Sequence, residues 1–359
     1  MIRTVLSPLC LLAAGLIAAP AGATALRVYN WAEFIAPGLV EAFTEETGIA
    51  VTYDTYASGE TVEAMLLAGG AGYDLVVVSS EYIGRLVARG SIAPLDAGAL
   101  SRHGGLDPAV MGKLDRLDPG NRHAVPYLWG TTGLGIDREK IAARMPDAPL
   151  DSWALLFEPA NVSRFSDCGV GLVDAPEEVL AAALLYLGHE PGAADEAARA
   201  EALGVLQAIN PHVTSIRSTM MGGLASGEFC LVLGWSSDVV WAREHDGAPE
   251  GLDFVIPREG GLIWFDVFVI PADAADPEAA HRFIDFMLRP EIIAQSTDYL
   301  WTANAVPAAD VLTDPDVLAD PAVVPDAAMR ARLHAIRALD AEQKGRLDSA
   351  WTRLKLGLF

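Results

Sequence analysis

The chain has 359 residues, with 48 acidic against 25 basic side chains and a formal net charge of −23 at pH 7. Nucleic-acid phosphates require Lys and Arg, so this balance argues against a nucleic-acid partner. An acidic surface steers cationic ligands toward a protein, but it also serves solubility alone, and both explanations stay open. The length exceeds that at which one hydrophobic core stops growing, so we expect two lobes.

The first residues predict export. Arg3 precedes an apolar run over 5–19, and small residues follow at Ala21-Gly22-Ala23. This is the pattern of a signal peptide over 1–23, cleaved after the last of these residues or, alternatively, after Ala25. The apolar run is too short for a membrane-spanning helix.

Export makes the three cysteines informative. A lipid anchor at Cys10 is an alternative to cleavage, but Leu9 before it is not the small residue that such anchors need. Cleavage would remove Cys10 and leave Cys168 and Cys230 in an oxidising compartment, where we expect a disulfide. Chain entropy gives such a bridge a stabilisation of about 4 kcal/mol. Two buried thiols that never meet are the alternative.

Strands and helices alternate through the first half of the mature chain. The apolar run over 75–78 is typical of a buried parallel strand, and Ser58 is placed to cap a helix. Further strands are expected over 26–29 and 49–53, and helices are expected to end at Gly48, Gly69 and Gly90. This alternation predicts a parallel sheet with helices on both faces.

The second half repeats the alternation. Expected strands cover 170–173, 229–233 and 262–270, and expected helices cover 176–187, 194–209, 277–288, 290–295 and 341–356. The Asp-, Pro- and Ala-rich stretch over 308–326 is expected to be a surface connection. Asp266 lies inside an otherwise apolar strand, where a charge is costly unless it is paired.

Signatures of catalysis are missing from the sequence. The seven histidines show no metal-binding spacing, and the chain has no Gly-x-Ser-x-Gly motif or phosphate-binding loop. The adjacent acids Glu177 and Glu178 would point about a quarter-turn apart on a helix, so they would not face one substrate atom. We therefore expect no enzymatic activity, no metal and no cofactor.

Tryptophans stand near carboxylates in three segments, which favours a cationic ligand. The three combinations are Trp31 with Glu33, Trp235 with Asp238, and Trp264 with Asp266. Carboxylates bind ammonium groups through charge-assisted hydrogen bonds, and aromatic faces attract cations. Trp31 and Trp235 each follow an apolar strand, where open α/β sheets bind ligands. One such segment alone would be explained by a buried Trp and a helix cap, but three favour a binding site.

At these segments the sequence resembles the periplasmic polyamine-binding proteins of ABC transporters, closest to the putrescine-binding type. The resemblance covers essentially the whole mature chain. Its matching stretches are 28–31 (VYNW), 43–49 (FTEETGI), 73–77 (YDLVV), 126–133 (PYLWGTTG), 174–179 (DAPEEV), 234–235 (GW) with Asp238, 265–268 (FDVF) and 303–305 (ANA).

The resemblance implies a type II periplasmic binding protein fold. Two α/β lobes with parallel-dominated sheets flanked by helices would hold the ligand in a cleft between them. The expected first lobe comprises 24–131 and about 265–308, and the expected second lobe comprises about 132–264 and 309–359. Binding proteins of this kind close about a hinge when the ligand contacts both lobes.

The resemblance also implies the site residues. Trp31 and Trp235 would be aromatic walls, Asp238 and Asp266 would be carboxylate anchors, and Glu178 would hold one terminal amine. The full expected set is Trp31, Glu33, Phe34, Ser79, Glu178, Ser218, Trp235, Asp238, Trp264, Asp266 and Thr302, with a bridge between Cys168 and Cys230.

Some of these positions depart from the family pattern. After Trp31 the family usually has a hydroxyl residue, an acid and a tyrosine, and here the sequence has Ala32, Glu33 and Phe34. Thr302 stands where the family has a tyrosine. Glu81 places an acid where a small or aromatic residue is expected. Trp264 and Glu33 resemble the spermidine-binding branch. The resemblance therefore identifies polyamines as the ligand class but does not single out one polyamine.

The resemblance implies capture of a polyamine, putrescine or spermidine, in the periplasm and its delivery to the permease of an ABC importer. We expect a monomer that needs no cofactor. A binding protein for another cationic solute is an alternative, but a cationic amino acid would need a cation for its carboxylate, and no Arg or Lys lies in the expected pocket segments. A periplasmic polyamine sensor and an enzyme acting on amines are further alternatives.

Overall fold

The computed structural model describes residues 25–336 and 339–358. The expected signal peptide over 1–23, and Cys10 within it, lie outside this part of the chain. Within it, no helix combines the length and the apolar character that crossing a bilayer requires.

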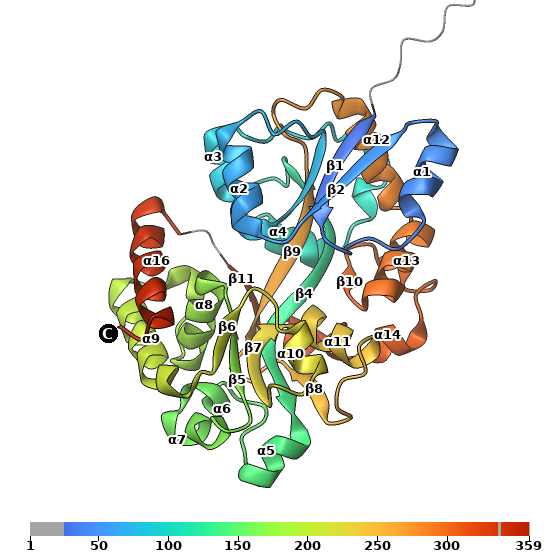
Figure 1. Ribbon diagram of the computed structural model, residues 1–359. Helices are drawn as coiled ribbons and strands as arrows, with labels where there is room; N and C mark the ends of the chain where they lie inside the picture. Colours follow the sequence, from blue (N-terminus) through green and yellow to red (C-terminus); the bar gives the residue numbers. More distant parts are fainter. Residues whose placement is uncertain (1–24, 337–338, 359) are drawn as a thin grey trace, which may run out of the picture.

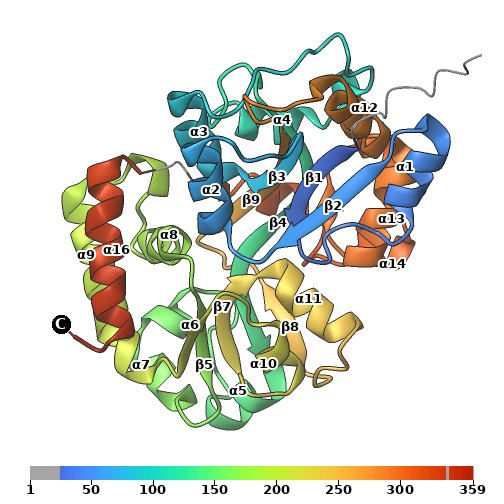
Figure 2. The ribbon, with the colours of Figure 1, turned by 45° about the horizontal axis from the view of Figure 1, so that its top comes forward.

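Two α/β lobes share one mixed sheet (Figures 1 and 2). The strand order is β2-β1-β3-β9-β4-β7-β5-β6, with β8 and β10 paired to β4 and β11 paired to β9. The long strands β4 (Ala124–Asp137) and β9 (Gly261–Val269) pair with each other and run from one lobe into the other. The expected two-lobed α/β fold is confirmed.

The first lobe is built on three parallel strands, as the sequence predicts. They are β1 (Leu26–Trp31), β2 (Val51–Tyr56) and β3 (Leu75–Ser79). Its helices are α1 (Leu39–Thr47), α2 (Gly59–Ala68), α3 (Ile83–Arg89), α4 (Pro108–Leu114), α12 (Pro277–Met287) and α13 (Pro290–Leu300). Ser58 Oγ accepts the Thr61 N–H at the start of α2, and Gly48 ends α1 with a left-handed φ of 72°.

The second lobe repeats this pattern. Its strands are β5 (Val170–Val173), β6 (Ser215–Arg217), β7 (Leu231–Trp235) and β8 (Leu252–Val255). Its helices are α5 (Arg138–Arg144), α6 (Ala154–Phe157), α7 (Pro159–Val162), α8 (Pro176–Tyr186), α9 (Glu196–Ile209), α10 (Met221–Ala225), α11 (Ser236–Glu244) and α16 (Ala341–Lys355). Strand β5 pairs in parallel with both β6 and β7.

The remaining strands and α-helices, together with one 3-10 turn, lie between α13 and α16. They are β10 (Ala303–Asn304), the 3-10 turn η6 (Pro307–Ala309), α14 (Pro315–Ala319), α15 (Ala327–Arg330) and β11 (Leu333–Ala335). The stretch expected as a plain surface connection therefore contains two short helical segments, and buried Val317 and Val323 anchor it to the core.

Strand β4, with 14 residues, is the longest of the elements that the sequence pattern did not predict. Its proline and three glycines resemble strand breakers. Pro126 is tolerated because the register with β9 shifts between Pro126 and Leu128. A Cβ on Gly133 would lie 2.6 Å from the carbonyl oxygen of Val255, so close packing requires glycine there. Strands β4 and β9 pair antiparallel, and the predicted parallel pairing prevails in the outer strands of each lobe.

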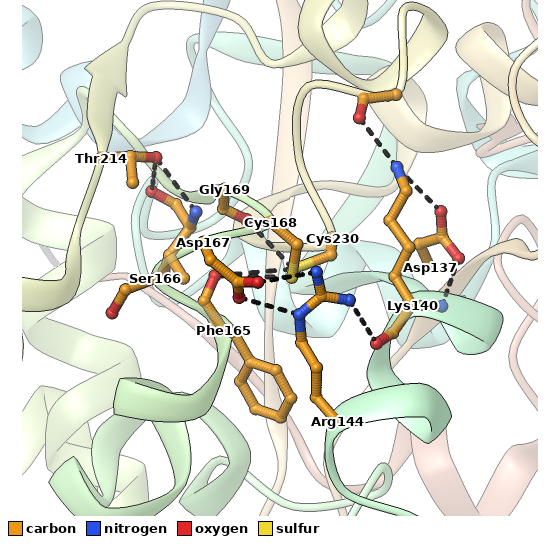
Figure 3. The surroundings of a disulfide bond; sticks show 12 residues. Asp137, Lys140, Arg144, Phe165, Ser166, Asp167, Cys168, Gly169, Thr214 and Cys230 are labelled. Atoms are coloured by element: carbon orange, nitrogen blue, oxygen red, sulfur yellow. Dashed lines mark hydrogen bonds and ion pairs between the residues drawn. A yellow bond between two sulfur atoms is a disulfide. The ribbon is translucent and has the colours of Figure 1, made fainter.

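Cys168 and Cys230 form a disulfide, as expected (Figure 3). Their Cα atoms are 5.5 Å apart, and the bridge closes a loop of 62 residues. Cys168 lies just before β5 and Cys230 just before β7, so the bridge ties together the starting ends of two neighbouring parallel strands. The ion pair of Arg144 with Asp167, at 2.8 Å, lies beside it.

Removal of the bridge should destabilise the protein without weakening ligand binding. Chain entropy gives a bridge that closes a loop of this length a stabilisation of about 4 kcal/mol, and this is lost when the bridge is removed. We expect Cys168→Ala/Cys230→Ala to lower the free energy of unfolding by about 2–4 kcal/mol in urea titrations. Ligand affinity should stay unchanged, because the bridge lies at the end of β7 opposite to Trp235. Unchanged stability would contradict the prediction, and intact mass after alkylation checks that the bridge is present in the parent protein.

Candidate ligand-binding site

Three of the expected site residues are the last residues of strands. Trp31 ends β1, Ser79 ends β3 and Trp235 ends β7. The carboxyl ends of parallel strands meet at one edge of a sheet, so each lobe presents its strand ends to a common edge. Both tryptophans remain partly exposed there, which leaves ring surface available to a ligand.

Asp266 lies at this edge in the first lobe. It is directly paired with Ser79 across β3 and β9, and its side chain is buried at 6% exposure. The Trp31 indole N–H donates to its Oδ1 at 2.9 Å. Burial raises the pKa of Asp266 to about 7, the Trp31 hydrogen bond partly offsets this rise, and the nearby Glu178 carboxylate adds to it. A neutral donor therefore holds a carboxylate whose charge stays unpaired.

Glu178 mirrors this arrangement in the second lobe. It lies in the first turn of α8, and its carboxylate accepts hydrogen bonds from the Trp235 indole N–H at 3.0 Å and from the Thr132 hydroxyl. Its side chain is buried, and burial raises its pKa to about 7, against the opposing effect of these hydrogen bonds. Each lobe thus carries one tryptophan and one buried carboxylate joined by an indole N–H.

Asp238 is also buried, but its carboxylate accepts hydrogen bonds from a neighbouring turn of the protein. It lies in the first turn of α11 and accepts the Met220 N–H at 2.7 Å and the Thr219 hydroxyl at 3.0 Å. Burial raises its pKa to about 6, and the hydrogen bonds counteract this. It therefore fixes the turn before α10. Ser218, one residue before this turn, is exposed.

Three further residues of the expected site, at positions 33, 34 and 302, have other local surroundings. Glu33 is exposed in the turn after β1, with a φ of 57°. Phe34 is partly exposed and packs edge-on against Tyr127, with ring centroids 6.2 Å apart. Thr302 is buried, and its hydroxyl donates to the Leu300 carbonyl oxygen at 3.1 Å. The hydroxyl of Thr302 is thus already used within its own turn.

Trp264 covers the backbone at Gly130, where an added Cβ would collide with its ring. It stands two residues before Asp266 on β9, so both side chains lie on the same face of the sheet. Its indole N–H is buried and has no partner in the described part of the chain. Trp264 therefore offers an unused donor on the face that carries Asp266.

Sequence reasoning missed three contributors to the site. Thr132 lies in the unpredicted strand β4 and donates to Glu178. Tyr56 ends β2 and packs against the Trp31 ring, with centroids 4.4 Å apart. Its position at a strand end was the available signal. Glu81 follows β3 and, although noticed as a departure, was not placed in the site; burial, together with the Glu178 and Glu177 carboxylates, raises its pKa well above the usual range.

Positive charge is scarce around these acids. No ion pair among residues 25–336 and 339–358 involves Asp266, Glu178 or Asp238. Arg85 lies nearby, but its Nε donates to the Glu63 carboxylate. The arrangement can therefore bind cations, and the nearby arginine is already paired with a protein carboxylate.

The fold and this site define a solute-binding protein. The family model of bacterial extracellular solute-binding proteins matches residues 38–325, and the chain belongs to this family. It is a binding protein and not an enzyme.

Two related proteins and one solved structure match the chain over most of its length. Over 340 residues, the chain is 38% identical to the putrescine-binding periplasmic protein PotF of Escherichia coli K12, covering 92% of this chain and 91% of that protein. Identity to the putrescine-binding periplasmic protein SpuD of Pseudomonas aeruginosa is 38% over 337 residues, covering 92% of each. A solved structure of a putative spermidine/putrescine ABC transporter protein from Listeria monocytogenes matches with a TM-score of 0.80 and 29% identity, covering 92% of this chain and 99% of that one.

The unpaired carboxylates should make the ligand-free protein less stable at higher pH. The pKa of Asp266 is about 7 in the folded protein against an ordinary value of 3.8, so the folded state holds a proton that the unfolded state releases. This contribution to stability is complete below about pH 4 and is lost as the pH rises through 7. At pH 8, we expect Asp266→Asn to raise the free energy of unfolding by about 2 kcal/mol.

Thermal melts of the ligand-free protein between pH 5 and 8 measure this effect. Glu178→Gln should flatten the pH dependence as Asp266→Asn does, while Asp246→Asn, at an exposed position, should not. A lower melting temperature of Asp266→Asn at pH 8 would contradict the prediction, since it would mean that protein groups stabilise the charge.

Proposed function

We propose that this protein captures a polyamine, putrescine or spermidine, between its lobes in the periplasm and delivers it to an ABC importer. The observation that carries the proposal is the matched arrangement of Asp266 and Glu178. Each is a buried carboxylate held by the indole N–H of a tryptophan from its own lobe and lacks a cation partner in the described residues.

The chemistry of this arrangement suits a chain with an ammonium group at each end. One ammonium would pair with Asp266 and the other with Glu178, through charge-assisted hydrogen bonds. The indole N–H groups of Trp31 and Trp235 orient the two carboxylates, and the partly exposed rings can cover the methylenes between the ammonium groups. The unfavourable burial of two charges in the empty protein would be relieved on binding.

The same arrangement disfavours amino acids. An α-carboxylate in the cleft would meet Asp266, Glu178 and Glu81, and Arg85 is already bound to Glu63. The relatives support the polyamine class, because PotF and SpuD are putrescine-binding proteins and the Listeria structure is a putative spermidine/putrescine transporter protein.

We further propose where the lobes divide. Strands β4 and β9 provide two crossovers, near the expected boundaries 131/132 and 264/265. The Asp314 N–H donates to Asp298 in α13 of the first lobe, whereas the Asp320 carboxylate forms an ion pair with Arg243 in α11 of the second lobe. We therefore propose that the third crossover follows Asp314, later than the expected boundary at 308, and precedes β11, which pairs with β9 at Gly261. A cleaved signal peptide, a monomeric state and docking to a permease complete the proposal.

Asp266→Asn should weaken polyamine binding. The substitution keeps the shape and the Trp31 contact but removes the charge that would pair with an ammonium group. We expect a loss of about 2 kcal/mol or more, roughly thirtyfold in Kd, by calorimetry with putrescine and spermidine. Asp246→Asn is the control for net charge and should bind as the parent protein does. An unchanged affinity of Asp266→Asn would remove Asp266 from the site.

The purified protein should bind a polyamine and convert none. Calorimetry against putrescine, cadaverine, spermidine and spermine identifies the preferred ligand, and mass spectrometry of the recovered amine tests for turnover. The absence of binding to all four at millimolar concentration would overturn the proposed function, as would conversion of any of them.

A further inference from the structure

Charged groups from the two lobes approach each other beside the proposed polyamine site, at Arg85. Arg85 belongs to α3 of the first lobe, and Glu63 belongs to α2 of the same lobe. Glu177 belongs to α8 of the second lobe. Both views of the ribbon place α8 next to α2 across the gap between the lobes (Figures 1 and 2).

Arg85 forms a hydrogen bond within the first lobe but only a longer contact with the second lobe. Its Nε donates to Glu63 Oε1, whereas its Nη1 lies 3.6 Å from Glu177 Oε1, beyond hydrogen-bond length. The side chains of Arg85 and Glu177 are only 20% and 11% exposed. Arg85 Nη1 and Glu177 Oε2 are both buried and have no hydrogen-bond partner among the described residues.

Two unsatisfied buried groups of opposite charge, one on each lobe, identify a contact that is nearly formed. Buried polar groups are normally hydrogen-bonded, and a carboxylate and a guanidinium can form two parallel bonds. An approach of the lobes by less than about 1 Å would bring Arg85 Nη1 into hydrogen-bond range of Glu177. The same movement would give the unpartnered Arg85 Nη1 an acceptor.

The surrounding charges are consistent with an incomplete pair. Burial raises the pKa of Glu177, and Arg85, Lys344 and the Leu339 backbone amide oppose this without cancelling it. Burial acts to lower the pKa of Arg85, but the neighbouring carboxylates, Glu63 foremost, raise it overall. Lys344 itself forms an ion pair with Asp348 within α16, at 3.1 Å. Arg85 is therefore a cation that is placed to bridge the lobes beside the proposed site.

We propose that Arg85 is an interlobe latch, which Glu63 holds in place and which engages Glu177 when the lobes close. The inference rests on the proposed function, because closure is driven by a ligand that contacts both lobes. Opening of the lobes would separate Arg85 from Glu177 but leave its bond to Glu63 intact. The latch thus stabilises the closed state and acts mainly on ligand release.

Glu177→Gln tests the latch, and Glu63→Gln is its matched control. Both variants remove one negative charge from the same arginine, but only Glu177 lies on the opposite lobe. We expect Glu177→Gln to raise the polyamine dissociation rate about tenfold in stopped-flow tryptophan fluorescence, with an association rate changed less than about twofold. Its ligand-free melting temperature should not fall. Glu63→Gln should lower that melting temperature and change the dissociation rate less.

The outcomes separate the latch from the proposed function. If the parent protein binds no polyamine, both are overturned. If it binds and Glu177→Gln dissociates at the parent rate, the latch is wrong and the polyamine function stands. Equal dissociation rates in Glu177→Gln and Glu63→Gln would also overturn the latch, since Arg85 would then act within the first lobe alone. Arg85→Gln/Glu177→Gln should dissociate no faster than Arg85→Gln, because the pair is already broken.

Discussion

The structure depends on one constraint, which is that two carboxylates are buried where no cation of the described residues neutralises them. Asp266 and Glu178 are each held by an indole N–H, and burial raises the pKa of each to about 7. A neutral donor can orient a carboxylate but cannot compensate its charge. The empty site is therefore unfavourable in a way that a ligand with two ammonium groups would correct, and this is the basis of the selectivity that we propose.

The fold supplies the geometry that this chemistry needs. Trp31 and Trp235 end parallel strands on different lobes, so each lobe brings a tryptophan and a carboxylate to the facing edges. Strands β4 and β9 pair along their length and cross between the lobes, which makes them a continuous support at the hinge. Thr132 on β4 and Asp266 on β9 contribute directly to the two halves of the site. The disulfide lies at the far end of the second lobe and stiffens the strands that lead to the site.

Several parts of this arrangement could be predicted from local sequence. The apolar runs before Trp31 and Trp235 identified strand ends, and an acid inside an apolar strand identified Asp266 as a costly position that needs a partner. Other expected residues have different local surroundings. Ser218 and Glu33 are exposed, and Asp238 is satisfied by the turn before α10. The partners of Asp238 are the Met220 N–H and the Thr219 hydroxyl, and the turn that supplies them has no readable pattern in the sequence.

The sequence alone determined the alternation of strands and helices, the caps at Ser58 and Gly48, and the unusual position of Asp266, because these follow from local periodicity and from the cost of isolated charges. The resemblance to a known family supplied Glu178. Tertiary structure decided the rest. Strand β4 is stable despite Pro126 and its glycines because neighbouring strands provide its hydrogen bonds and need the space. The meeting of Arg85 with Glu177 depends on how two lobes approach each other, and residues 92 positions apart in the chain carry no local signal of that contact.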